Sequence, residues 1–207
     1  MKGKLIVFEG IDGTGKSTQL EMTYQWLRSI GYIPIVTKHP GGTQLGTVIR
    51  NKLLPVAPMS DKSKLLLLAA DLANNTHLTL KPWLDMGYII LCDRYIDSMY
   101  AYQGYGQGFK KSFIDSIIDF ATDGLQADLT ILLDVELTTA ISRIKQKDAI
   151  ELSGKDFYER VISGYENQLV VNKNMVKLNA NKSKMDLHQD VKILIADRID
   201  KWDVKKL

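Results

Sequence analysis

The sequence lacks most of the features that mark a secreted or membrane protein. Cys92 is the only cysteine among 207 residues, which excludes an internal disulfide. The longest apolar run, residues 65–70, is far shorter than the roughly 20 residues of a membrane-spanning helix. The apolar stretch near the N-terminus is also too short for a signal peptide. We therefore expect a cytoplasmic protein that has no membrane partner.

A strong charge of either sign is also missing. Lys and Arg number 27 against 24 Asp and Glu, which leaves a net charge of +3. Because the basic residues form no long run, we expect no nucleic-acid partner. His39, His77 and His188 are not spaced as a metal site. No internal repeat or linker interrupts the chain, so we expect a single domain over residues 1–207.

What is present is a regular alternation of short apolar runs with longer amphipathic segments. The apolar runs predict strands at residues 4–9, 33–37, 88–93, 128–135 and 175–180. The segments between them predict helices at about 17–29, 44–54, 60–85, 110–123, 136–146, 155–173 and 186–202. Ser60 suits a helix start, while Gly31 and Gly87 suit C-terminal caps. Apolar strands separated by helices predict an α/β fold in three layers, with a five-stranded parallel sheet between two layers of helices.

The clearest chemical motif is FEGIDGTGKST, residues 8–18, between the first predicted strand and the first predicted helix. It matches the phosphate-binding pattern G-x-x-x-x-G-K-[ST] and so predicts a P-loop NTPase-type fold. Main-chain N–H groups and the helix N-terminus bind phosphate in such a loop. Lys16 is expected to contact the β- and γ-phosphates of ATP, and Ser17 to bind Mg²⁺. The predicted ATP-binding residues are Gly10, Ile11, Asp12, Gly13, Thr14, Gly15, Lys16, Ser17 and Thr18.

Two further stretches leave the ends of the second and third predicted strands. They are TKHPGGTQLGTVIR, residues 37–50, and DRYIDSMYAYQGYGQG, residues 93–108. Ligands of parallel sheets bind beyond the carboxyl ends of the strands, so both stretches should meet Asp12 in one cleft. Arg50 and Arg94 are suited to bind the phosphate of a second nucleotide there, because a guanidinium can hold phosphate through two hydrogen bonds.

In their order and spacing these motifs resemble those of thymidylate kinases, P-loop enzymes that transfer the γ-phosphate of ATP to dTMP. The resemblance runs nearly end to end and includes ADLTILLDV and DFYERVISGYE. It implies that Lys16, Asp12, Arg94 and Arg143 act in catalysis. It also implies that Arg143 packs against adenine, that Ser17 and Asp93 lie at the metal, that residues 144–155 form a lid and that the protein is a homodimer. The acceptor-binding residues it implies are Asp12, Pro40, Arg50, Leu68, Leu72, Asn75, Arg94, Met99, Tyr102 and Gln103.

The match departs from the family pattern where the acceptor base is expected to bind. The family has an aromatic residue and, four residues later, an arginine on the third helix, whereas Leu68 and Leu72 stand here. Met99 replaces a polar residue. Three interpretations are open. In the first, the side-chain amide of Asn74, Asn75 or Gln103 contacts the base. In the second, the acceptor is a different deoxynucleoside monophosphate. In the third, the leucines pack in the core and the register of the helix differs.

The predicted lid also differs, because residues 148–151 read DAIE where an arginine is usual, and Gln107 replaces another arginine. A nucleotide-binding protein with little turnover is therefore a second hypothesis. A GTPase is a third, but residues 172–175 lack the aspartate of the N-K-x-D guanine-binding motif.

Overall fold

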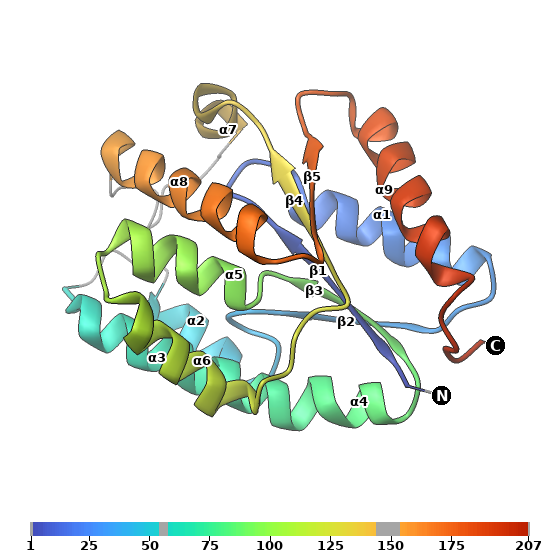
Figure 1. Cartoon of the computed structure of the whole chain (residues 1–207), viewed down its shortest axis with the longest axis horizontal. Helices are drawn as coiled ribbons and strands as arrows, with labels where there is room; N and C mark the ends of the chain where they lie inside the picture. The colour runs from blue at the N-terminus through green and yellow to red at the C-terminus, as the bar shows by residue number, and fades with distance from the viewer. Residues whose placement is uncertain (1, 54–57, 144–153, 207) are drawn as a thin grey trace.

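The computed structural model describes residues 2–53, 58–143 and 154–206. A parallel sheet with the strand order β2-β3-β1-β4-β5 runs through its centre (Figure 1). Its strands are β1 (Lys4–Glu9), β2 (Pro34–Lys38), β3 (Ile89–Asp93), β4 (Leu129–Asp134) and β5 (Met175–Asn179). The predicted five-stranded parallel sheet is confirmed, and each strand end agrees with its prediction to within one residue.

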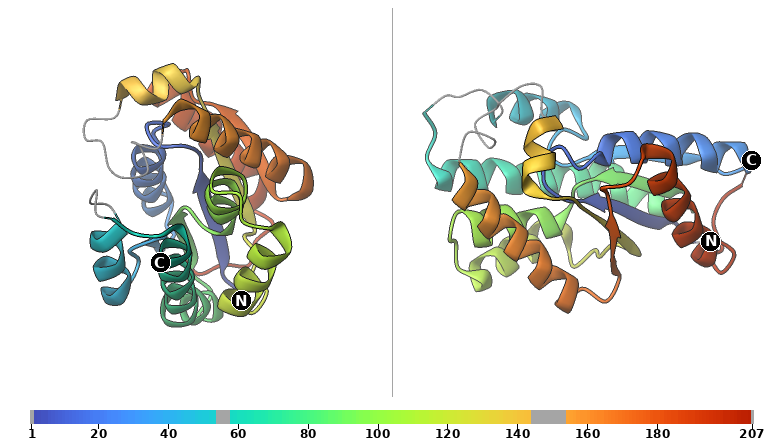
Figure 2. Two further views of the ribbon diagram at one scale, coloured as in Figure 1. Left: turned by 90° about the vertical axis from the view of Figure 1, so that its left-hand side faces the viewer. Right: turned by 90° about the horizontal axis from the view of Figure 1, so that it is seen from above.

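Helices cover both faces of the sheet (Figure 2). They are α1 (Lys16–Ser29), α2 (Gln44–Leu53), α3 (Asp61–Asn75), α4 (Lys81–Asp85), α5 (Ile96–Met99), α6 (Lys111–Thr122), α7 (Leu137–Arg143), α8 (Lys155–Val171) and α9 (Lys184–Ile199). Two π-helical segments, η1 (Thr76–Leu80) and η2 (Tyr100–Gly106), continue α3 and α5. Helices α1 and α9 lie on one face, and α3, α4 and α6 lie on the other.

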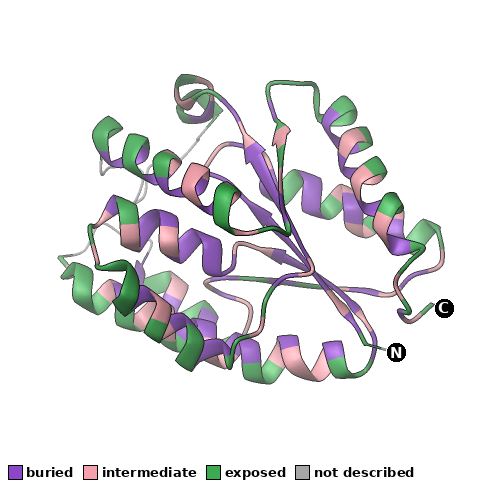
Figure 3. Cartoon of the chain, in the orientation of Figure 1, coloured by how far each residue is buried: buried purple, intermediate pink, exposed green. Residues whose placement is uncertain are grey.

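Alternate residues of β1 enter different halves of the core. Leu5 and Val7 pack among side chains of α3, α4 and α6, whereas Ile6 and Phe8 pack among those of α1 and α9. All four side chains are fully buried, as is most of the central sheet (Figure 3). Residues 5–8 of β1 are covered on both faces of the sheet, which explains why this part of the strand is apolar at every position.

The three capping residues predicted from the sequence, Ser60, Gly31 and Gly87, lie at helix ends in the structure. The Ser60 side chain accepts a hydrogen bond of 3.1 Å from the main-chain N–H of Ser63 at the start of α3. Gly31 and Gly87 follow α1 and α4 with φ angles of 88° and 85°, the left-handed conformation that glycine adopts most easily.

The helical segment formed by α5 and η2 is absent from the sequence-based prediction. Gly106 of η2 and Gly164 of α8 allow close packing of these two helices and do not form turns. A Cβ on Gly106 would lie 2.7 Å from the ring of Phe157, and one on Gly164 would lie 2.7 Å from the Cα of Ala101. Both positions let α8 approach η2 closely, and this contact places Tyr165 of α8 beside the loop that follows β1.

Candidate functional site

A cleft of about 500 Å³ opens at the carboxyl ends of β1, β2 and β3. The loop after β1 forms one wall, and residues at the ends of β2 and β3 form the opposite one. Of the predicted site residues, those that line it are Asp12, Gly13, Gly15, Lys16, Ser17, Thr18, Arg50, Asp93, Arg94 and Arg143. Lys38 and His39 line it as well, although the sequence analysis assigned them no role.

Glycine is required at two positions of the loop after β1. Gly10 has a φ angle of 138°, and a Cβ there would lie 2.5 Å from the carbonyl oxygen of Leu133. Gly13 has a φ angle of 83°, and a Cβ there would overlap the carbonyl oxygen of Ala140. The loop is therefore pressed against β4 and α7, which leaves its other side facing the cleft.

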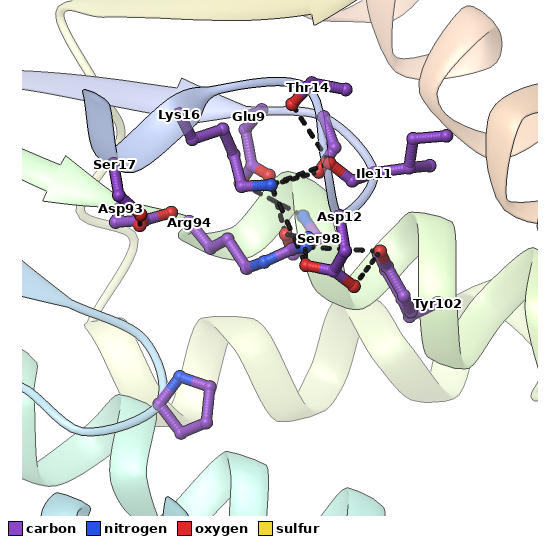
Figure 4. A network of polar contacts seen from close by, with 12 residues as sticks. Glu9, Ile11, Asp12, Thr14, Lys16, Ser17, Asp93, Arg94, Ser98 and Tyr102 are labelled. Atoms are coloured by element: carbon purple, nitrogen blue, oxygen red, sulfur yellow. Dashed lines mark hydrogen bonds and ion pairs between the residues drawn. The ribbon is translucent and has the colours of Figure 1, made fainter. Parts of the chain in front are cut away.

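Lys16 lies at the centre of this loop (Figure 4). Its ammonium donates hydrogen bonds to the carbonyl oxygens of Gly10, at 3.0 Å, and Ile11, at 2.8 Å. Burial and the neighbouring charge of Arg94 lower the pKa of Lys16 to about 8, although Asp12 acts in the opposite direction. The loop thus holds a buried ammonium that is hydrogen-bonded to neutral carbonyls and lies 3.9 Å from the carboxylate of Asp12. Thr14 closes the turn by donating to the carbonyl of Ile11.

Asp12 and Arg94 form an ion pair across the cleft (Figure 4). Burial alone would raise the pKa of Asp12, but the charges of Arg94 and Lys16 outweigh it and hold this pKa at about 2. The hydroxyl of Tyr102 donates to the other carboxylate oxygen of Asp12 at 3.3 Å. Asp12 is therefore a carboxylate at all ordinary pH values, and its negative charge is matched by the arginine.

Arg94 is fixed by its backbone as well as by its side chain. Its φ angle of 68° is left-handed, and its N–H donates to the carbonyl of Phe8 at 3.0 Å. The guanidinium also donates to the hydroxyls of Ser98, Tyr102 and Tyr165 at 3.1–3.2 Å. An arginine held by so many groups is preorganised, so binding an anion requires little reordering of its side chain.

Glu9 is linked to Arg94 through the hydroxyls of Ser98 and Tyr165, which contact both residues. No role was predicted for Glu9 from the sequence. The hydroxyls of Ser98 and Tyr165 donate to Glu9 at 2.6 Å and 2.9 Å. Burial raises the pKa of Glu9, while Arg94 opposes that rise. Glu9, Ser98 and Tyr165 lie in the motifs FEG, DRYIDS and ISGYE. Their presence in these motifs could have identified them as site residues from the sequence.

A second buried carboxylate, Asp97, lies on α5. Asn172 donates to its two oxygens at 3.2 Å and 3.3 Å, and Thr130 lies at 3.5 Å. Burial and the charge of Glu9 raise the pKa of Asp97 to about 7. This group therefore titrates near neutral pH.

Ser17 and Asp93 are suited to hold a divalent cation. The Ser17 hydroxyl donates to Oδ2 of Asp93 at 2.8 Å. The other carboxylate oxygen of Asp93 is buried and has no hydrogen-bond partner among the described residues. An unpaired carboxylate oxygen beside a hydroxyl fits the oxygen ligands that Mg²⁺ prefers. No cluster of three or more His, Cys, Asp or Glu side chains offers another metal site in the described part of the chain.

Arg50 and Pro40 lie together on the wall opposite the loop. The guanidinium of Arg50 donates to the Pro40 carbonyl at 3.1 Å, and this half-buried side chain lines the cleft. Arg143, at the end of α7, also lines the cleft and lies 3.5 Å from the carbonyl of Ala180. Arg50, Arg94 and Arg143 thus surround the same space.

The residues predicted to surround the acceptor base are mostly buried. Leu72 and Met99 are 0% and 1% exposed and pack in the core with Leu5 and Val7. This placement favours the interpretation that the leucines of α3 pack inside, and it gives Leu72 and Met99 no surface on the cleft. Leu68 is half-buried, and Gln103 is buried.

Asn75 is also fully buried, and its amide is already engaged. It accepts a hydrogen bond from Thr37 at 2.8 Å and donates to the carbonyl of Lys38 at 3.4 Å. Asn74 donates to Thr43 at 2.8 Å. Asn75 thus uses both its oxygen and its NH₂ group inside the protein, whereas Asn74 uses one N–H. Residues 144–153 of the predicted lid lie outside the described residues, and α8 begins at Lys155.

A parallel sheet of this strand order, with a phosphate-binding loop after its central strand and arginines facing that loop, defines a P-loop nucleotide kinase. Comparison with known proteins agrees. Residues 8–191 match the model of the thymidylate kinase family. The chain is 38% identical to a thymidylate kinase of Trichormus variabilis, with 98% of this chain and all of that protein covered.

A second relative, the thymidylate kinase of Nostoc punctiforme, is 46% identical over 80% of this chain and 82% of its own length. The crystal structure of a thymidylate kinase from Ehrlichia chaffeensis superposes with a TM-score of 0.80 at 31% identity, covering 94% of this chain and all of that one. The chain belongs to the thymidylate kinase family. It is therefore a phosphotransferase with ATP as a substrate.

Proposed function

We propose that this protein transfers the γ-phosphate of ATP to dTMP, giving ADP and dTDP. The observation that carries the proposal is the single cleft in which Lys16 and the loop face Arg50 and Arg94. Each wall offers positive charge to one phosphate-bearing molecule, and the two walls are close enough to share a cleft of about 500 Å³. Family membership supports thymidine monophosphate as the acceptor.

In this mechanism the donor phosphates bind to the main-chain N–H groups of the loop and to the ammonium of Lys16. The acceptor phosphate binds to Arg94 and Arg50. Asp12 lies between the two walls, where its carboxylate holds Arg94 in place and faces the acceptor. Phosphoryl transfer needs alignment and neutralisation of charge more than covalent catalysis, so these groups suffice.

Ser17 and Asp93 would hold Mg²⁺ beside the donor phosphates. When bound, the ion supplies positive charge that offsets the charge on the transferred phosphoryl group.

The experiment is an ADP-release assay with ATP, Mg²⁺ and a panel of acceptors: dTMP, dUMP, dCMP, dAMP and dGMP. We expect the highest kcat/KM with dTMP. If none of the acceptors releases ADP while ATP still binds, the second hypothesis, a nucleotide-binding protein with little turnover, replaces this one. A Lys16→Met variant prepared in parallel controls for contaminating kinases.

We also infer that the protein forms a homodimer. Phe113 and Phe120, seven residues apart and so on one face of α6, are 50% and 85% exposed. Light scattering after size exclusion should give twice the monomer mass, and Phe120→Lys should shift it toward the monomer. Val170→Lys, at an apolar side chain of α8 that is 81% exposed, is the control. A monomeric parent protein would contradict the inference.

No helix in the described ranges is long and apolar enough to cross a membrane. The cytoplasmic location stays a prediction.

A further inference from the structure

We propose that His39, oriented by Asp71, is a specificity-determining residue that accepts a hydrogen bond from the base of the acceptor nucleotide. The inference rests on the proposed function and deepens it, because it names the residue that reads the acceptor. His39 lies just after β2, and it lines the cleft together with Arg50.

The imidazole is held at one nitrogen and unpaired at the other. Nδ1 of His39 lies 2.6 Å from a carboxylate oxygen of Asp71, whose other oxygen accepts a hydrogen bond from the N–H of Gly41 at 3.1 Å. The two side chains are 2% and 0% exposed. Nε2 of His39 has no hydrogen-bond partner among the described residues. Buried polar atoms are seldom left unpaired, so this nitrogen points to a partner that arrives with the ligand.

Besides Asp93, His39 is the residue lining the cleft that carries a buried side-chain atom without a hydrogen-bond partner among the described residues. The sequence analysis left open which group supplies a polar contact to the acceptor base. The amides of Asn74 and Asn75 are engaged with Thr43, Thr37 and the Lys38 carbonyl. The position where the family has an arginine on α3 holds Leu72, which lies in the core and offers no polar atom to a base.

The carboxylate of Asp71 fixes the chemistry of the contact. In the proposed contact, Nδ1–H of His39 donates to the carboxylate of Asp71, which leaves the lone pair on Nε2. The ligand atom must therefore donate. A phosphate dianion has no hydrogen to donate, whereas thymine and uracil carry N3–H. Cytosine has a lone pair at that position, so it would face Nε2 with a second acceptor.

The first test uses the unaltered protein. In the ¹⁵N spectrum of labelled histidine, the Nε2 resonance of His39, assigned with a His39→Gln variant, should shift on addition of dTMP and not of ATP alone. An unchanged resonance at saturating dTMP overturns the inference, and a shift of equal size with ATP alone does so too. Turnover of dTMP with an unchanged resonance leaves the proposed function intact, so the two failures are distinguishable.

The second test is kinetic and uses His39→Phe, which keeps a planar ring without the nitrogen. We expect the ratio of kcat/KM for dTMP over dCMP to fall about 10-fold, with the KM for ATP unchanged within about twofold. His39→Gln, which can still accept a hydrogen bond, should recover part of the ratio. Thr37→Val is the matched control, because it removes the neighbouring polar contact between β2 and α3 and should leave the ratio intact. A purely structural role, or a buried water on Nε2, would lower stability in His39→Phe without changing the ratio, and that result overturns the inference.

Discussion

Replacing Asp97 by asparagine should remove much of the pH dependence of this protein's stability. Burial and the charge of Glu9 raise the pKa of Asp97 from 3.8 to about 7 in the folded protein. A raised pKa means that the folded state prefers the protonated carboxyl. The free energy of unfolding therefore falls as pH rises from about 4 through 7 and is constant outside that window.

The size of this effect follows from the shift. About three pKa units at 1.36 kcal/mol each give about 4 kcal/mol in total, of which about 2–3 kcal/mol is lost between pH 5 and pH 8. Such a loss is large beside the 5–15 kcal/mol that usually stabilises a domain. Asp97 is 2% exposed, so solvent screening does little to reduce it. Glu9, whose pKa burial also raises, acts in the same direction.

The assay is urea unfolding followed by tryptophan fluorescence at pH 5, 6, 7 and 8. The difference in unfolding free energy between Asp97→Asn and the parent should rise by about 2–3 kcal/mol in favour of the variant across this range. Asp197→Asn, which removes an exposed carboxylate from α9, is the control and should show no such trend. If Asp97→Asn and the parent lose stability in parallel, the carboxyl of Asp97 is already ionised at pH 5 and the reasoning fails.

Three further predictions concern the loop and the helix ends. Lys16→Met should lower kcat by at least about 10²–10³-fold, since the lost ammonium acts on the transferring phosphate. The circular dichroism spectrum should be unchanged. A smaller loss of kcat would show that another cation takes the place of the ammonium. Gly13→Ala should cost about 2–3 kcal/mol in chemical unfolding, because the new Cβ meets the Ala140 carbonyl at a φ of 83°, and a neutral effect would mean that the loop is free to move. Ser60→Ala should cost about 1 kcal/mol through loss of the cap on α3, whereas Ser60→Asp should restore it.

The strands and the phosphate-binding loop could be predicted because their signals are local. A buried strand such as β3 is apolar from Ile89 to Cys92, and the loop needs glycine, lysine and serine at fixed spacing. The helical segment from α5 to η2 could not be predicted from the sequence. Gly106 indicates a turn in the sequence, whereas in the fold it allows close packing against Phe157. The role of Gly106 depends on α8, more than 50 residues away in the chain.

The surroundings of the acceptor nucleotide were the part of the site that the sequence predicted least well. Leu72 and Met99 were assigned to it by family position, yet both lie in the core. His39 was dismissed as a metal ligand from its spacing alone, and only the fold shows that Asp71 lies beside it. Contacts between a strand end and a helix about 30 residues later leave no periodic trace in a sequence.

The hydrogen bonds of Lys16 have a consequence for the thermodynamics of donor binding. An incoming polyphosphate does not add a contact to a free ammonium; it displaces the Gly10 and Ile11 carbonyls that the ammonium already contacts. It also adds negative charge beside a group whose pKa burial has lowered to about 8. Binding at pH 8.5 should therefore draw a proton from solution, so that the calorimetric heat depends on the ionisation enthalpy of the buffer.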